Sequence, residues 1–189
     1  GFGRLETDTV VTEQLFMADY PAEPAYLEAI RERISEDDVV VSYNGKSFDS
    51  QILRTRFLLH GMHLPLGVQL DLLYTARRLW RARLGECSLG SVERGVLGLS
   101  RLQDLPSGEV PERYFAFLRS TDPTALEDVF AHHLQDIESL VSLLARAERI
   151  YADPLGAREV DRYQLGRRLL GMGREEGSVL LQQVARESP

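Results

Sequence analysis

The sequence has few of the features that mark secreted, membrane-spanning or strongly basic proteins. Its 189 residues contain a single cysteine, Cys87, which excludes an internal disulfide framework and favours a reducing, cytoplasmic location. No apolar run approaches the roughly 20 residues that a membrane span requires, and no signal peptide stands at the start. The net charge of −7 argues against a broad surface that coats nucleic acid, but it is compatible with a local basic groove.

The chain is long enough for one domain of ordinary size and a small appendage. Its 43% apolar content is sufficient for a core. Because it begins with Gly1-Phe-Gly and not with Met, we expect it to be a fragment of a longer protein.

The stretch from Asp38 to Asp49, DVVVSYNGKSFD, predicts a short strand, a tight turn and the start of a helix. Val39–Val41 is a β-branched run, typical of a strand covered on both faces. Asn44-Gly45 is a turn dipeptide, and Ser47 is a suitable helix N-cap. Asp49 would then lie beyond the carboxyl end of a strand, where open α/β sheets bind their ligands. The alternative is that Asp49 only complements the helix dipole.

The remaining pattern predicts an α/β domain in which helices flank a mixed sheet. The expected elements are a β-hairpin over 1–17, helices over 21–35, 47–60, 72–84, 88–97, 111–120 and 122–150, and a strand over 68–71. In the helix over 47–60 we expect Ile52, Leu53 and Phe57 to face inward. Asp71 could be a metal ligand, but we favour a structural capping role for it.

Two groups of side chains have both a structural and a functional interpretation. Arg77, Arg78 and Arg81 cluster opposite the apolar face of their predicted helix. They form either a solvated charged face or a ridge that contacts phosphates. The aromatic residues of the helix over 111–120 could stack on bases, but packing is the favoured interpretation.

The predicted helix over 122–150 carries His132 and Asp136, which are four residues apart and therefore project from one face. A pair at this spacing is usually a surface pair. After this helix the pattern changes, and 151–189 predicts a helix–turn–helix appendage.

Several strings together resemble a known family. Asn44-x-x-x-Phe48-Asp49-x-x-x-Leu53 is similar to the second motif of the DEDD 3′→5′ exonucleases. The string Tyr43-Asn-Gly-Lys-Ser-Phe-Asp49 more specifically resembles bacterial YprB-type ribonuclease-H-like domains. Further matches, in the same order, are 70–80 (LDLLYTARRLW), 87–93 (CSLGSVE), 109–115 (EVPERYF) and 132–137 (HHLQDI). The resemblance covers roughly residues 1–148. The region from Leu165 to Pro189 resembles one tetratricopeptide repeat.

The resemblance implies a ribonuclease-H-like fold and a site for Mg²⁺ or Mn²⁺, with two metals in the complete domain. Asp49 and Asp136 would be metal ligands and His132 the general base. The position of His132, four residues before Asp136, matches one subclass, whereas its residue type matches another. Asn44 would position Asp49 or a phosphate, and Lys46 would meet a phosphate as a point charge.

The sequence departs from the family in lacking its first motif, Asp-x-Glu. Leu5-Glu6-Thr7 does not supply it, because no Asp precedes Glu6 at the needed spacing and no buried strand leads up to it. We therefore expect the first strand of the fold, with its two carboxylates, to lie before residue 1. The chain as given should then be catalytically impaired.

The leading hypothesis is a metal-dependent 3′→5′ exonuclease-like domain over 1–150 that acts on DNA or RNA. The rival is a non-catalytic ribonuclease-H-like binding module. In this rival the helical hairpin over 151–189 would recruit a protein partner. A nucleotide- or sugar-processing enzyme is less favoured, since no Gly-x-Gly-x-x-Gly loop follows a strand.

Overall fold

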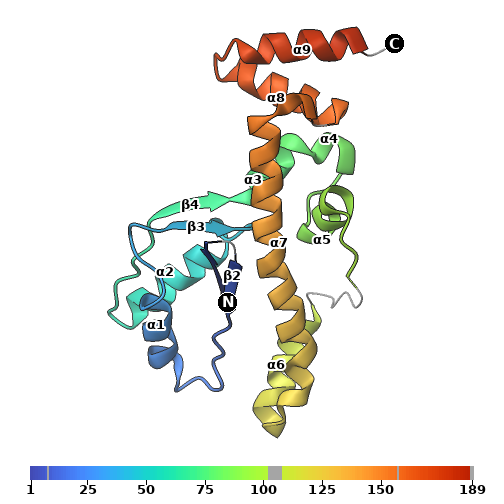
Figure 1. Ribbon diagram of the computed structural model, residues 1–189. Coiled ribbons are helices and arrows are strands. Elements are labelled where there is room, and N and C mark those ends of the chain that lie inside the picture. The colour runs from blue at the N-terminus through green and yellow to red at the C-terminus, as the bar shows by residue number, and fades with distance from the viewer. Residues whose placement is uncertain (8, 102–107, 157, 188–189) are drawn as a thin grey trace. The chain divides into compact units, whose positions relative to one another are not determined.

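The computed structural model describes residues 1–7, 9–101, 108–156 and 158–187 (Figure 1). In chain order its elements are β1 (Phe2–Glu6), β2 (Thr9–Glu13), α1 (Glu23–Arg31), β3 (Val39–Ser42), α2 (Asp49–Leu59), β4 (Val68–Asp71), α3 (Leu72–Leu79), α4 (Arg81–Leu84), α5 (Leu89–Val92), a π-helical turn (Glu93–Leu97), α6 (Glu109–Ser120), a 3₁₀ turn (Pro123–Leu126), α7 (Glu127–Ala152), a second 3₁₀ turn (Pro154–Gly156), α8 (Glu159–Gly171) and α9 (Glu176–Glu187). The predicted α/β class and the C-terminal helices are confirmed. Within the described ranges, no helix combines the length and the apolar character that a membrane crossing needs.

The described strands pair as two small sheets and not as the single mixed sheet that the sequence predicts. β1 and β2 are antiparallel, with Phe2 opposite Glu13 and Glu6 opposite Thr9, which confirms the predicted hairpin. β3 pairs with β4 in the second sheet. Val39 is 60% exposed, so the expectation that β3 is covered on both faces is wrong.

Contacts divide the chain into two compact units, each built from two segments. The first unit comprises residues 1–70 and 101–140, and the second comprises 71–100 and 141–189. The predicted domain boundary near residue 150 stays a prediction.

The core of the first unit contains apolar residues of α1 and α2. Leu27, Ile30 and Phe57 are almost completely buried there, together with Leu64. Leu53 is partly buried against them, whereas Ile52 is 47% exposed and does not face inward as predicted. The helix α2 therefore buries a narrower stripe than its sequence suggests.

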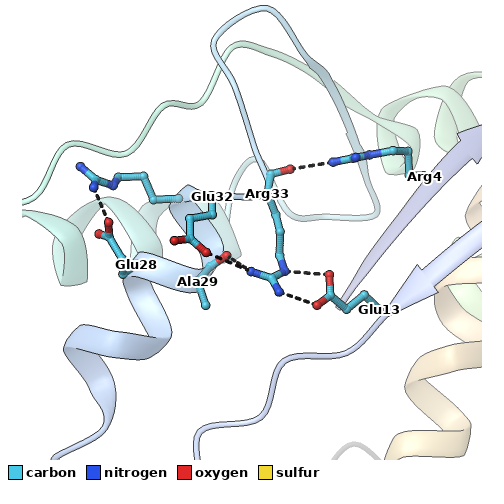
Figure 2. A network of polar contacts seen from close by, with 7 residues as sticks. Arg4, Glu13, Glu28, Ala29, Glu32 and Arg33 are labelled. Atoms are coloured by element: carbon cyan, nitrogen blue, oxygen red, sulfur yellow. Dashed lines mark hydrogen bonds and ion pairs between the residues drawn. The ribbon is translucent and has the colours of Figure 1, made fainter.

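Arg33 connects the β-hairpin to the end of α1 (Figure 2). Its Nε and Nη2 donate to the two carboxylate oxygens of Glu13 at 2.7 and 2.5 Å, and its Nη1 donates to the carbonyl of Ala29 at 2.7 Å. Arg4 donates to the Arg33 carbonyl at 3.4 Å. A bidentate arginine–carboxylate pair fixes direction as well as distance, so this contact orients β2 relative to α1.

A second ionic contact joins α1 to α2. Arg56 donates to both carboxylate oxygens of Glu23, and His60 Nε2 lies 2.8 Å from Glu23 Oε2. The hydrogen bonds from Arg56, followed by that from His60, lower the pKa of Glu23 from its usual 4.5 to about 2. A carboxyl group with a depressed pKa stabilises the folded state above its usual pKa, and this contribution is lost as the pH falls through the folded-state value.

Glu23→Gln is therefore expected to lower the stability of the first unit at neutral pH. The difference from the wild type should shrink below about pH 4.5 and disappear only below about pH 2, where the wild-type carboxyl is also protonated in the folded state. Acid unfolding followed by circular dichroism measures this. Glu28→Gln is the matched control, since its pair with Arg31 lies within one helix and is solvent-exposed. A Glu23→Gln deficit that persists unchanged at pH 2 would contradict the ionic origin.

The aromatic residues of α6 pack within the first unit. The ring of Phe16 makes edge-to-face contacts with Tyr114, Phe117 and Phe130. The Tyr114 hydroxyl donates to the carbonyl of Met17 at 3.0 Å. Tyr114 and Phe117 therefore have the packing role that the sequence favours. Phe115 is 47% exposed.

The second unit buries the predicted apolar face of residues 72–80. Leu72, Ala76, Leu79 and Trp80 are 0–1% exposed. Asp71 Oδ1 accepts from the backbone N–H of Leu73 at 3.1 Å, which confirms its capping role. The helix is not continuous to residue 84 as predicted, because α3 ends at Leu79 and α4 begins at Arg81.

The helices α8 and α9 pack closely because glycines stand at their crossing. A Cβ on Gly177 would lie 2.6 Å from the carbonyl oxygen of Gly166 and 2.4 Å from the backbone nitrogen of Leu170. Both distances are far inside van der Waals contact and involve backbone atoms, which cannot rotate away. The crossing therefore requires a residue without a side chain at position 177.

Gly177→Ala is expected to lower the free energy of unfolding of the second unit by about 1–3 kcal/mol, the usual cost of overpacking. Gly171→Ala is the matched control, since a Cβ there meets nothing within 4 Å and alanine favours the helix by about 1 kcal/mol. Urea unfolding followed by fluorescence of the single tryptophan, Trp80, would report the change, because Trp80 is fully buried in this unit. Equal effects of both substitutions would show that the crossing is not tight.

Candidate functional site

Asp49 lies where the sequence predicts, in the first turn of α2 immediately after the turn that follows β3. The turn is tight, because a Cβ on Gly45 would lie 2.7 Å from both Cβ and Oγ of Ser42. That same Cβ position is 3.5 Å from Asp49 Oδ2, so the carboxylate stands beside the Gly45 backbone. Phe48, and not Ser47, occupies the N-cap position, which corrects the predicted cap.

Asn44 and Lys46 flank Gly45 and are exposed. Asn44 has a φ of 63°, a left-handed conformation that asparagine tolerates better than most residues. The backbone N–H of Ser50 donates to the Gly45 carbonyl at 2.8 Å, and its side chain donates to Gln69 of β4 at 2.6 Å. These bonds fix the start of α2 against the β3–β4 sheet and hold Asp49 at the end of β3.

Asp136 and His132 project from one face of α7, as their spacing predicts. His132 Nε2 lies 3.7 Å from Asp136 Oδ2. Arg101 joins them, with its Nη2 donating to Asp136 Oδ1 at 2.5 Å and its Nη1 at 3.0 and 2.9 Å from Nδ1 and Nε2 of His132. The Arg101 side chain is only 7% exposed, against 30% for Asp136 and 17% for His132.

The start of β1 lies against the same helix. A Cβ on Gly1 would lie 2.6 Å from His133 Cε1 and 2.6 Å from Ile137 Cδ1, and one on Gly3 would also meet Ile137 at 2.6 Å. Burial lowers the pKa of His133, whereas Asp136 opposes the shift. Gly1 therefore packs on the turn of α7 that contains Asp136.

Arg77, Arg78 and Arg81 belong to the second unit and are exposed. Arg77 and Arg78 lie in the last turn of α3, and Arg81 begins α4. Burial raises the pKa of the nearby Cys87 thiol, and Arg77 and Arg81 oppose the shift. Arg77 and Arg81 therefore both lie near Cys87, and all three arginines are exposed to solvent.

Comparison with known families identifies the fold of this site. The family model of the RNase H superfamily matches residues 1–148. The chain belongs to the RNase H superfamily. Membership supports a nuclease-like or nucleic-acid-related role, and it covers the segments that contain Asp49, Arg101, His132 and Asp136.

One curated relative is the protein called "Uncharacterized protein YprB" from Bacillus subtilis (strain 168). It is 36% identical over 148 residues, which is 76% of this chain and 35% of the relative. The chain thus spans about a third of the length of that protein. No solved structure matches the chain.

RNase H-like nucleases generally use divalent metal ions. The described residues contain no group of three or more histidine, cysteine, aspartate or glutamate side chains arranged to hold one. Asp49 and Asp136 supply hard oxygen donors, and Mg²⁺ is commonly held by one or two carboxylates with water and substrate phosphates completing its shell. The donor chemistry of these two side chains therefore fits a hydrated divalent cation.

Sequence reasoning did not identify Arg101. It lies 31 and 35 residues from its two partners, and no spacing rule connects it to α7. The approach of β1 to α7 had a weak signal, because the glycines of Gly1-Phe-Gly3 suit a strand that another element approaches closely.

Proposed function

We propose that this domain carries a metal-dependent 3′→5′ exonuclease-type site that hydrolyses phosphodiester bonds of DNA or RNA. The observation that supports the proposal is the match of the RNase H superfamily model to residues 1–148, which include Asp49 in the first turn of α2 and Asp136 on α7. His132 lies on the same face of α7 as Asp136, with its Nε2 3.7 Å from Asp136 Oδ2.

Each residue has a specific task in this proposal. Asp49 and Asp136 hold Mg²⁺ or Mn²⁺, with a second metal expected when the complete domain supplies its first two carboxylates. When bound, the metal supplies stabilisation of the negative charge that develops on the phosphate oxygens. His132 takes a proton from the attacking water, Asn44 orients Asp49 or a phosphate, and Lys46 contributes a positive charge close to the turn.

Arg77, Arg78 and Arg81 contact the nucleic-acid backbone. Exposed arginines on neighbouring turns bind phosphates without reading sequence, which suits an enzyme that degrades a strand stepwise. Because the net charge of the chain is −7, its overall charge does not attract nucleic acid, which makes a local cationic cluster more important.

For the hairpin of α8 and α9 we propose a tetratricopeptide-like repeat, in a second domain over 151–189, that binds a protein partner. Large apolar side chains on these helices and in the turn between them are exposed. This is expected of a repeat whose outer face is covered by an adjacent repeat or a partner. They are Tyr163, Leu170, Met172 and Val179.

The proposal is tested with end-labelled single-stranded DNA and RNA, incubated with the full-length protein and Mn²⁺ or Mg²⁺. We expect stepwise shortening from the 3′ end and its loss in Asp136→Asn. Asp128→Asn is the matched control, because Asp128 lies on the same helix and also pairs with an arginine, Arg113, at 3.0 Å. Activity equal in all three proteins would assign the cleavage to another site.

The rival function is a non-catalytic RNase H-like module. The ion pair of Asp136 with Arg101 favours it, since a carboxylate that binds an arginine needs no metal. Under this alternative the wild type cleaves neither nucleic acid and binds no Mn²⁺.

A further inference from the structure

Arg101 is an almost fully buried cation placed on the two residues of α7 to which we assign chemistry. Its guanidinium donates to Asp136 Oδ1 through Nη2 and lies against the ring nitrogens of His132 through Nη1. Its side chain is more buried than either partner. A surface salt bridge forms between mobile side chains, whereas this contact is built into the packing of the first unit.

The arrangement conflicts with the proposed tasks of both partners. A metal-ligating carboxylate must direct oxygen lone pairs at the cation, but Oδ1 of Asp136 accepts from Arg101. A general base needs a free lone pair, and a guanidinium can only donate, so a ring nitrogen of His132 that accepts from Arg101 cannot also accept from water. While Arg101 stays in place, a cation bound to Asp136 would lie beside a guanidinium of like charge, and a ring nitrogen that accepts from Arg101 cannot take a proton from water.

We propose that Arg101 and a divalent cation alternate at Asp136. In the metal-free protein, Arg101 balances the negative charge of Asp136. It also occupies the ring nitrogen that His132 would need as a base. When the cation binds, Arg101 leaves Asp136 and releases the ring of His132. Arg101 is thus a positioning residue that couples the readiness of the base to metal occupancy. The inference rests on the proposed function.

The exchange has a measurable cost in metal affinity. If Arg101 leaves Asp136 open in about one molecule in ten, the apparent dissociation constant for the metal rises about tenfold. Removing the guanidinium should restore the intrinsic affinity, although it also leaves the carboxylate without its partner in the metal-free state.

The first test uses the wild-type protein and therefore needs no variant. Phenylglyoxal, which modifies accessible arginines, is applied with and without saturating Mn²⁺, and the modified positions are found by peptide mass spectrometry. We expect the modification rate of Arg101 to rise severalfold with Mn²⁺. Arg83 is the internal control, since it is also a buried arginine paired with an aspartate, Asp161, but belongs to the other unit. An unchanged or slower rate at Arg101 would overturn the exchange.

The second test measures Mn²⁺ affinity by electron paramagnetic resonance in the wild type, Arg101→Gln and Arg113→Gln. We expect about tenfold tighter binding by Arg101→Gln. Arg113→Gln removes the same charge from the same unit without touching Asp136, so its affinity should match the wild type. Wild-type binding with no gain in Arg101→Gln would refute the exchange alone. Absence of binding in both would refute the metal site and the exchange together.

Discussion

Under the proposed function, Asp49→Asn is expected to lower the metal-dependent nuclease activity of the full-length protein at least about 100-fold, with little change in fold. The carboxylate is exposed at the beginning of α2, so its replacement by an amide of the same shape leaves the packing intact. An amide oxygen carries no charge and is a weaker ligand for a hard divalent cation. The measurement is the rate of 3′-end release at saturating Mn²⁺, normalised to folded protein.

The same substitution separates the two interpretations of Asp49. If the side chain only complements the dipole of α2, its loss costs about 0.3–1 kcal/mol of stability and leaves activity unchanged. Asp49→Glu sharpens the distinction, because it keeps the charge in the first turn of the helix and displaces the carboxylate by one methylene. If Asp49 is a metal ligand, Asp49→Glu should be inactive but should have normal stability. Full activity in Asp49→Glu and Asp49→Asn would leave only the dipole role.

Residues that act through one metal should not contribute independently. The double variant Asp49→Asn/Asp136→Asn should therefore be about as inactive as either single variant, since loss of one ligand already disables the site. Multiplicative losses would indicate that the two carboxylates serve separate steps, and the shared-cation assignment would fail.

What the sequence predicted well depends on local chemistry. Asp71 caps α3 through Leu73, and His132 and Asp136 share one face of α7, because capping and helical spacing involve residues only a few positions apart. The turn before Asp49 was equally readable, since Asn44-Gly45 restricts the backbone to few conformations. These short-range rules predicted the local geometry around both carboxylates, whereas their assignment as metal ligands came from the family resemblance.

What the sequence missed depends on contacts between distant segments. The β-branched residues of β3 indicated a strand correctly, but they could not show that Val39 would be 60% exposed, because strand propensity does not specify which face is covered. The same limit applies to Arg101, which resembles any other arginine of this arginine-rich chain until α7 is placed beside it. Asp136 and His132 therefore have an arginine partner that their motif does not indicate.

The second unit contains the other large expected effect, at a buried ion pair. Arg83 donates to both carboxylate oxygens of Asp161, from Nε at 3.2 Å and from Nη2 at 3.3 Å, and also to the carbonyl of Gly95 at 2.7 Å. The Asp161 side chain is only 1% exposed. Arg83→Met is expected to lower the free energy of unfolding of this unit by about 3–5 kcal/mol, because it leaves a buried carboxylate without its countercharge.

Most of the loss of stability should come from leaving the Asp161 carboxylate buried without a countercharge, and less from losing the ion pair itself. A second substitution tests this. Arg83→Met/Asp161→Leu removes both charges and should recover most of the stability, apart from the hydrogen bond to Gly95. Chemical unfolding monitored by Trp80 measures all three proteins, with Arg174→Met, from an exposed pair, as a control of unchanged stability. A double variant less stable than Arg83→Met would mean that the pair itself stabilises the unit. Recovery would mean that the pair serves to fix how α8 meets the rest of its unit, at little net gain in stability.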